Sequence, residues 1–215
     1  HFDLVFQEPD PEILTRNADL VFTALPHQAA MDMVPALLDR GVKVIDLSAD
    51  YRFRDPAVYE AWYQPHKTPE LLTEAVYGRP ELYRDAISRA RLVGNPGCYP
   101  TSIILAAAPL LHHGLVRPET VIADSKSGVS GAGRGASLAV HFCEVNEGFK
   151  AYKVCEHRHT PEIEQELGRL AGRPVTINFT QHLVPMSRGI LRTVYATIES
   201  GVSPERIDEA FRAFY

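Results

Sequence analysis

The chain has 215 residues, a formal net charge of −5 and an apolar share of 45%, with 23% of its residues charged. This length allows one large domain or two modest ones, each with an apolar core. The Lys and Arg residues are scattered and form no basic block, which argues against nucleic acid as the main partner. No apolar stretch approaches the roughly 20 residues that span a bilayer, so we expect no membrane partner.

The cysteines and the N-terminus indicate the cellular compartment. Cys98, Cys143 and Cys155 make an odd number for a disulfide framework, and a chain of this size needs none. The N-terminus has no basic region followed by an apolar one, as a secretory signal would. We therefore expect a protein of the reducing cytoplasm. Residues 1–8 resemble a strand, and we expect this segment to begin inside a domain.

The first half of the chain follows the rhythm of strand, helix and strand. Residues 20–24 (LVFTA) form a continuous apolar run, as in a buried parallel strand, and residues 28–38 then predict a helix. This order predicts a right-handed βαβ unit with helices covering a parallel sheet. The remaining elements predicted in this half are a strand at 42–47, a polar loop at 46–52 and a strand at 91–94.

The second half changes in character. Residues 102–111 predict an apolar helix with Pro100 near its first turn, and the strands that follow alternate only partly. We therefore predict an α/β protein, with a parallel α/β domain over residues 1–97 and a mixed α+β domain over residues 98–215. The other predicted elements are strands at 120–125, 175–179 and 189–198, a charged amphipathic helix at 161–170 and a last helix opened by Ser203 and Pro204.

The most informative stretch is NPGCYPT, residues 95–101. Pro96 and Gly97 predict a tight turn that lets the backbone approach a ligand closely. Cys98 then lies at the start of a helix, where free N–H groups, the helix dipole and a cationic neighbour lower the pKa of a thiol. The same N–H groups and the Asn95 amide would hold an oxyanion. The alternative is a buried structural cysteine, but turn, cysteine and Pro-started helix together favour a catalytic role.

A base for this thiol is offered by YKVCEHRHT, residues 152–160. In an extended segment the imidazoles of His157 and His159 share one face, and either could take the thiol proton and later protonate an alkoxide. The alternative is a pair of surface or capping histidines. Together with Cys143 and Cys155, these histidines could also be ligands of a zinc ion. Their spacing, C-x11-C-x-H-x-H, lacks the compact C-x2–4-C knuckle of zinc sites, so we predict no metal.

Residues 125–135 (SKSGVSGAGRG) predict a loop with four glycines and three serines. Such a loop offers a row of backbone N–H groups that suits phosphate or a flat ring. It is neither a Walker A loop nor a G-x-G-x-x-G fingerprint. Arg134 matches phosphate or carboxylate in a bidentate fork. The alternative is a flexible surface loop.

Five blocks in one order resemble the N-acetyl-gamma-glutamyl-phosphate reductase family. They are DLSADYRF (46–53), GNPGCYPT (94–101), SGVSGAGR (127–134), HRHTPEI (157–163) and LVPMSRGIL (183–191). This family is grouped with the aspartate-semialdehyde dehydrogenases, whose fold joins a Rossmann domain to an α+β catalytic and dimerisation domain. The resemblance implies NADPH-dependent reduction of N-acetyl-L-glutamyl 5-phosphate in arginine biosynthesis, by a homodimer or homotetramer. Residues 1–97 would then be a partial Rossmann-like NADP-binding domain.

Carried onto this sequence, the resemblance implies that Cys98 is the nucleophile and His157 the acid/base. NADP(H) is the implied cofactor, contacted by the turn after the first strand, by the next strand's loop and by the glycine loop. The cofactor-binding candidates are Ala24, Leu25, Pro26, Ser48, Gly131, Ala132 and Gly133. The substrate-binding candidates are Asn95, Arg134, Tyr152, His159 and Arg188.

The family opens with a Gly-rich phosphate loop upstream of anything in this chain and continues past Tyr215, so we expect a central fragment. A related reductase acting on aspartyl or carrier-linked aminoadipyl phosphate shares the thiol chemistry, but Tyr99-Pro100 and HRHTPE are more similar to the acetylglutamyl enzymes. A Cys-His acyl hydrolase or transferase would account for Cys98 and His157 but would give the βαβ half no function. A folding or dimerisation module without activity is the third alternative.

Overall fold

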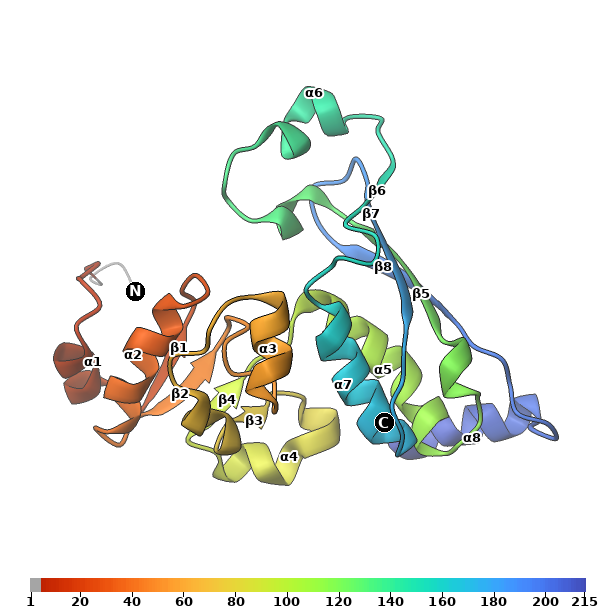
Figure 1. Ribbon diagram of the computed structural model, residues 1–215, viewed down its shortest axis with the longest axis horizontal. Helices are drawn as coiled ribbons and strands as arrows, with labels where there is room; N and C mark the ends of the chain where they lie inside the picture. The colour runs from red at the N-terminus through yellow and green to blue at the C-terminus, as the bar shows by residue number, and fades with distance from the viewer. Residues whose placement is uncertain (1–4) are drawn as a thin grey trace. The chain divides into compact units, whose positions relative to one another are not determined.

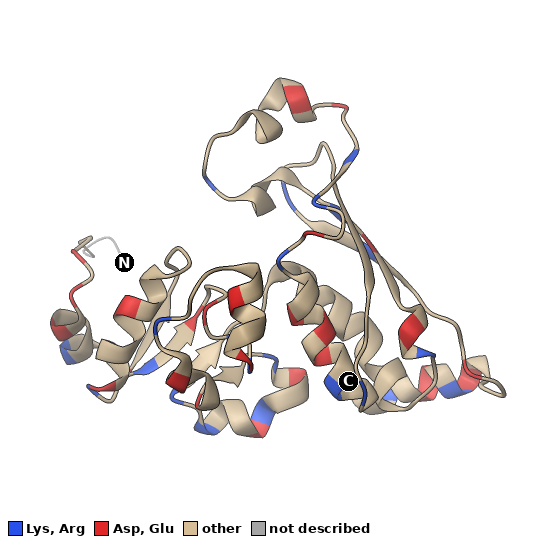
Figure 2. Ribbon diagram, viewed as in Figure 1, with Lys and Arg blue, Asp and Glu red and all other residues tan. Residues whose placement is uncertain are grey.

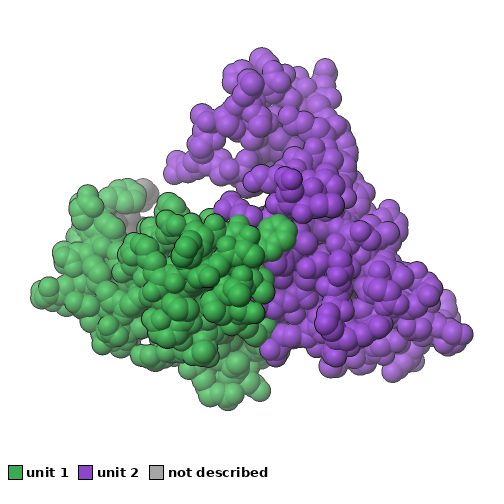
Figure 3. Space-filling model, viewed as in Figure 1, with its two compact units in different colours: residues 1–97 green, residues 98–215 purple. Residues whose placement is uncertain are grey.

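The computed structural model describes residues 5–215, and the chain divides into two compact units, residues 1–97 and residues 98–215 (Figure 3). Residues 1–4 lie outside the described part, so the strand predicted over residues 1–8 is tested only at residues 5–8, where no strand forms. None of the helices in residues 5–215 is long and apolar enough to cross a membrane. Basic and acidic residues are interspersed along both units (Figure 2).

The first unit contains a four-stranded parallel sheet in the order β1-β2-β4-β3 (Figure 1). The predicted parallel α/β fold is confirmed, and the strands predicted at residues 20–24, 42–47 and 91–94 and the helix predicted at residues 28–38 are present. The strands are β1 (Leu20–Thr23), β2 (Lys43–Asp46), β3 (Val76–Tyr77) and β4 (Leu92–Gly94). The helices are α1 (Pro11–Asn17), α2 (Ala29–Leu38), α3 (Pro56–Trp62) and α4 (Pro80–Arg89), with a 3₁₀ turn at Pro69–Thr73.

Three of these helices, α1, α3 and α4, were not predicted. Each begins with a proline at its first position, where the missing N–H costs no hydrogen bond. The Asp10 carboxylate accepts from the backbone N–H of Glu12 at 2.7 Å, and the Asp55 carboxylate accepts from that of Ala57 at 2.8 Å. An Asp-Pro pair is thus the local signal that starts two of the three helices.

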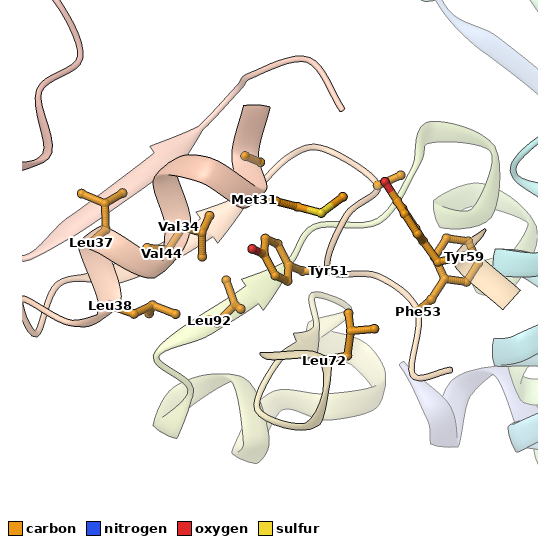
Figure 4. Packing of buried hydrophobic residues seen from close by; sticks show 12 residues of the cluster. Met31, Val34, Leu37, Leu38, Val44, Tyr51, Phe53, Tyr59, Leu72 and Leu92 are labelled. Atoms are coloured by element: carbon orange, nitrogen blue, oxygen red, sulfur yellow. The ribbon is translucent and has the colours of Figure 1, made fainter. Parts of the chain in front are cut away.

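The core of the first unit lies between α2 and the sheet (Figure 4). Met31, Val34 and Leu37 are at most 2% exposed and recur at the spacing of one helical face. Burying each such side chain contributes about 1.5–3 kcal/mol. The polar loop after β2 is anchored in the same core by Tyr51 and Phe53, each 1% exposed. The loop that follows a strand end is therefore fixed by aromatic packing.

The second unit contains a mixed sheet in the order β6-β7-β5-β8, in which β5 and β7 are parallel and the outer strands antiparallel. This confirms the predicted mixed α+β half. The strands are β5 (Ile122–Ser127), β6 (Lys150–Tyr152), β7 (Asn178–Leu183) and β8 (Ile190–Tyr195). The helices are α5 (Cys98–His112), α6 (Phe142–Val145), α7 (Thr160–Ala171) and α8 (Pro204–Phe214), with 3₁₀ turns at Pro118–Thr120, Val129–Ala132 and Leu138–Val140.

Helix α5 packs against α7, α8 and β8. The buried apolar residues of one of its faces recur at helical spacing and are at most 3% exposed. The helix begins at Cys98, four residues before the predicted start at 102. Pro100 is the third helical residue, where the absent N–H would have no intrahelical partner, so the proline opens the helix without breaking it. The buried residues of this face are Ile103, Ile104, Ala107, Ala108 and Leu111.

Candidate active site

Cys98 is a free, exposed cysteine and the first residue of a 15-residue helix. The first backbone N–H groups of such a helix have no intrahelical acceptor and carry the positive end of the helix dipole. The alternative of a buried structural cysteine is therefore wrong. The thiol is accessible at a position that favours negative charge.

Asn95 fixes the chain that leads to this helix. Its backbone N–H donates to the Asp46 carbonyl at 2.7 Å, and its own carbonyl accepts from Arg52 Nε at 2.7 Å. Its side-chain Nδ2 donates to the carbonyl of Pro96 at 3.3 Å. To contact an oxyanion as predicted, Asn95 Nδ2 would have to give up this long hydrogen bond to Pro96 and donate to the ligand.

Tyr99 is the buried centre around which the other side chains gather. It is 3% exposed, and its hydroxyl is 2.7 Å from the Tyr152 hydroxyl. Its ring meets the rings of His157 and Phe179 edge-on, at centroid distances of 5.1 and 5.2 Å. Burial raises the pKa of Tyr152, and its hydrogen bond to Tyr99 acts in the same direction. The Tyr152 phenol is therefore held as a neutral group beside the helix start.

The structure brings His157 and His159 together, with ring centroids 4.9 Å apart. The prediction of an extended segment is wrong, because residues 153–156 form a turn in which Lys153 and Cys155 have positive φ values of 46° and 62°. The two rings meet because residues 158–159 also form a turn, in which the His157 carbonyl accepts from the backbone N–H of Thr160 at 2.9 Å. His159 also lies near Tyr99, with ring centroids 5.9 Å apart.

The environment of His157 fixes its protonation state. The backbone N–H of His159 donates to His157 Nδ1 at 3.1 Å, so the neutral ring carries its proton on Nε2. Burial lowers the pKa of His157 to about 3, and the charges that add to this effect are those of His159, Lys153, Arg158 and Arg192. Near pH 7 the ring is neutral and presents an N–H donor.

Arg192 reaches the first turn of α5 from β8, and sequence reasoning missed it. Its Cζ lies 4.1 Å from the centroid of the Tyr99 ring, and its Nε donates to Ser102 Oγ. Ser102 Oγ is 3.2 Å from the carbonyl oxygens of both Cys98 and Tyr99. The guanidinium is thus docked on the turn that carries the thiol.

The sheet register places Arg192 at one end of a polar row. Residues paired directly across strands point to the same face. The paired residues of β6, β7, β5 and β8 are Tyr152, Gln181, Ser125 and Arg192. Because Tyr152 and Arg192 both contact Tyr99, the row crosses the face that carries the first turn of α5.

The glycine loop uses its amides internally. Gly128, Val129 and Ser130 donate to the carbonyls of Gly189, Met186 and Ser187 at 2.9–3.0 Å. Gly131 and Gly133 donate to carbonyls within the loop. The predicted row of free N–H groups is therefore wrong for these five amides, because the loop pairs with the turn between β7 and β8. Arg134 and Arg188 are exposed, and contacts from either to a substrate stay predictions.

The carboxyl ends of β1 and β2 form the edge expected to hold a dinucleotide. Ala24 and Pro26 are exposed and Leu25 half-buried in the turn before α2. Gln28 N donates to Asp50 Oδ2 at 2.9 Å, and Ala49 N to His27 Nδ1 at 3.1 Å. The two loops are thereby joined beside the start of α2, and the exposed residues of this turn leave the edge open to a dinucleotide.

Ser48 lies inside a buried network at this edge. It is 2% exposed and its hydroxyl donates to Asp46 Oδ2 at 2.5 Å, while Thr23 Oγ1 donates to Asp46 Oδ1 at 2.7 Å. Burial raises the pKa of Asp46, and these hydrogen bonds act against the rise. Ser48 thus shapes its loop from within, and a direct contact to a dinucleotide stays a prediction.

A zinc site finds no support in the geometry. Within residues 5–215, no group of three or more His, Cys, Asp or Glu side chains is placed to hold a metal ion. Cys143 and Cys155 are both exposed. The side chains that the structure does gather at one place in the second unit are Cys98, Tyr99, Tyr152, His157, His159 and Arg192.

Family models match both units. Residues 1–90 match the NAD binding domain of semialdehyde dehydrogenase, and residues 98–215 match its dimerisation domain. The chain belongs to the semialdehyde dehydrogenase family. A parallel α/β unit followed by a mixed α+β unit that begins with an exposed cysteine is in keeping with this assignment.

Curated relatives agree along the whole chain. An N-acetyl-gamma-glutamyl-phosphate reductase of Syntrophobacter fumaroxidans is 74% identical over 215 residues, which cover 100% of this chain and 62% of the relative. One of Geobacter metallireducens is 60% identical over 212 residues, covering 98% of this chain and 61% of the relative. The chain thus spans about three fifths of the length of these relatives.

Solved structures share the fold. Aspartate semialdehyde dehydrogenase II from Vibrio cholerae matches 90% of this chain and 60% of its own, with a TM-score of 0.65 and 14% identity. Aspartate semialdehyde dehydrogenase with NADP from Candida albicans matches 97% of this chain and 59% of its own, with a TM-score of 0.66 and 14% identity. At this identity the likeness establishes the fold alone.

Proposed function

We propose that this chain is part of an enzyme that uses NADPH to reduce N-acetyl-L-glutamyl 5-phosphate to N-acetyl-L-glutamate 5-semialdehyde and phosphate, in arginine biosynthesis. The observation that carries the proposal is the exposed Cys98 thiol at the first residue of α5, one residue from the Tyr99 ring that packs on His157. A relative that is 74% identical bears the name of this reductase. The whole enzyme would act as a homodimer or homotetramer in the reducing cytoplasm.

Cys98 would form the covalent intermediate. Its thiolate attacks the acyl carbon of the substrate, a C–S bond forms, and the C–O bond to phosphate breaks with phosphate leaving as the anion. A thioester stays electrophilic, whereas a carboxylate does not, which is why a thiol suits this chemistry. The bound nicotinamide cofactor supplies a hydride to the thioester carbon. The resulting oxyanion collapses, the C–S bond breaks, and the aldehyde leaves with the Cys98 thiolate restored.

His157 would act on the oxygen of the reacting carbonyl. Its neutral ring offers Nε2–H as a donor, because Nδ1 accepts from His159 N. A donor that strengthens as negative charge develops on the oxygen stabilises both tetrahedral stages. Removing the thiol proton at Nε2 would require the other tautomer, so the geometry favours His157 as donor to oxygen over His157 as base toward the thiol.

The remaining predicted residues would bind substrate and cofactor. NADP(H) would lie at the edge formed by the β1–α2 turn and the loop after β2. Substrate candidates are Asn95, Arg134, Tyr152, His159 and Arg188. Tyr152 is supported by its hydrogen bond beside the helix start, and His159 by its position next to His157.

The test is the reverse reaction in the intact protein, since phosphate-dependent reduction of NADP by an aldehyde separates a reductase from a Cys-His hydrolase or transferase. N-acetylglutamate semialdehyde should be a substrate and aspartate semialdehyde a poor one. Cys98→Ser should abolish NADP reduction, and Cys143→Ser, at an exposed thiol on α6, should preserve it. Near-normal activity in Cys98→Ser would refute the proposal.

A further inference from the structure

Arg192 is a half-buried residue whose terminal guanidinium nitrogens are buried and have no hydrogen-bond partner among the described residues. Nη1 and Nη2 are both buried and without a hydrogen bond, although Nε donates to Ser102. A buried charge without a counterion is costly, and a buried donor without an acceptor calls for an explanation. Stacking on Tyr99 accounts for one face of the guanidinium and leaves its charge uncompensated.

The groups that face Arg192 limit what its charge can act on. Ser125 and Gln181, its neighbours in the polar row, are neutral. Burial lowers the pKa of Arg192 to about 10, while Tyr99, Cys98 and Tyr152 act against this shift. The cationic or titratable groups on the turn before α7 that interact with His157 are Lys153, Arg158 and His159.

The groups that favour the charged guanidinium are one thiol and two phenols, and a thiol is by its chemistry the stronger acid. An ordinary thiol has a pKa of about 8.5 and an ordinary phenol one of about 10, and burial raises the pKa of Tyr152 further. His157 is neutral near pH 7, because its pKa is lowered to about 3, so it contributes no positive charge to a thiolate–imidazolium pair. A positive charge beside the thiol would therefore come from a residue other than His157.

We propose that Arg192 is a positioning residue whose guanidinium, docked on the first turn of α5, stabilises the Cys98 thiolate. The charge adds to the dipole at the helix start, and its burial reduces screening by solvent. The thiol proton passes to water, since Cys98 is exposed. The inference rests on the proposed role of Cys98 as nucleophile and identifies the group that keeps it ionised.

The test is the pH profile of alkylation by iodoacetamide, followed at each cysteine by mass spectrometry in the intact protein. In Arg192→Gln the midpoint for Cys98 should move to higher pH by about one unit, as expected for loss of a neighbouring opposite charge. Well below the midpoint, alkylation of Cys98 should then be about tenfold slower. Arg192→Lys, which keeps the charge, should stay close to the wild-type midpoint.

Two controls separate this effect from a general loss of charge or structure. Arg173→Gln removes an exposed arginine that pairs with Glu119 at 2.9 Å and should leave the Cys98 midpoint unchanged. Cys143 and Cys155 should keep their midpoints in every variant. An unchanged Cys98 midpoint in folded Arg192→Gln, or an equal shift in Arg192→Lys or Arg173→Gln, would overturn the inference.

A second measurement needs no variant of Arg192 and covers the case in which Arg192→Gln does not fold. The NMR signals of the Arg192 Nη groups in the wild-type protein should shift with the same pH midpoint as Cys98 alkylation, and Cys98→Ser should abolish that step. Arg192 Nη signals that show no step at the pH midpoint of Cys98 alkylation would contradict the inference. Both measurements use no substrate or cofactor, so they can fail or succeed independently of the reductase assay.

Discussion

The hydroxyl groups of Tyr99 and Tyr152 lie 2.7 Å apart and join the first turn of α5 to strand β6. Residue 152 is the last of that strand, and the turn leading to His157 follows it directly. One hydrogen bond therefore fixes the segment that carries the imidazoles against the helix that carries the thiol. The same contact underlies the first prediction.

Tyr152→Phe should destabilise the protein by about 1–3 kcal/mol, because the Tyr99 hydroxyl, buried in a residue that is 3% exposed, would lose its partner. The free energy of unfolding in urea measures the change. Tyr195→Phe is the matched control, since Tyr195 is 55% exposed on β8 and should tolerate the loss of its hydroxyl. Equal small effects in the two variants would mean that the hydrogen bond adds no stability.

His157 should make stability depend on pH. Its pKa is lowered from 6.5 to about 3 by burial. Between pH 6.5 and pH 3, His157 therefore binds a proton in the unfolded chain but stays neutral in the native protein. The stabilisation from neutral His157 is full above about pH 7 and is lost as the pH falls toward 3. His157→Gln should flatten unfolding free energy against pH over that range, whereas His141→Gln, at an exposed residue, should follow the wild type. Parallel curves for wild type and His157→Gln would contradict this account.

The two imidazoles should differ in their kinetic effect. His157→Gln should lower kcat of the intact enzyme by about 10²–10⁴-fold, the range for a group that assists proton or charge movement at the reacting atom. His159→Gln should cost less, because His159 is proposed to contact the substrate and not the reacting oxygen. Steady-state rates of both variants decide the assignment. A larger loss in His159→Gln would exchange the two roles.

Gly128→Ala should weaken the pairing of the glycine loop with the turn between β7 and β8. A Cβ at Gly128 would lie 2.8 Å from Arg188 N and 2.9 Å from Met186 O, so backbone must move. We expect a loss of about 1–3 kcal/mol in unfolding free energy, as for overpacking. Gly135→Ala, where a Cβ meets nothing within 4 Å, should change little. A tolerated Gly128→Ala would show that the loop shifts freely.

The fold could be predicted in large part because its signals are local. Apolar runs such as residues 20–24 and the turn before Cys98 carry their meaning within a few residues, and parallel strands with short connections leave few topologies. The strand β3 was not predicted, because its two residues are too few to show a periodic pattern. The turn at residues 153–156 was not predicted, because Lys153 and Cys155 adopt positive φ values although neither is a glycine, the residue that usually marks such a turn.

The candidate site was predicted only where residues carry a motif. Cys98 and the histidine pair stand in recognisable contexts, but nothing near Arg192 in sequence links it to a residue 94 positions earlier. Its place follows from the register that pairs β5 with β8 and from the cation–π contact to Tyr99. Register between distant strands is a property of the packed sheet, so it becomes visible only in the structure.

The central claim is that the Cys98 sulfur carries the acyl group, and trapping that thioester tests it most directly. The intact enzyme is mixed with N-acetylglutamyl phosphate without NADPH, quenched in acid and digested for mass spectrometry. We predict an N-acetylglutamyl adduct on the Cys98 peptide that hydroxylamine removes and that NADPH prevents from accumulating. An active enzyme whose acyl label sits on another residue, or on none, would contradict the account.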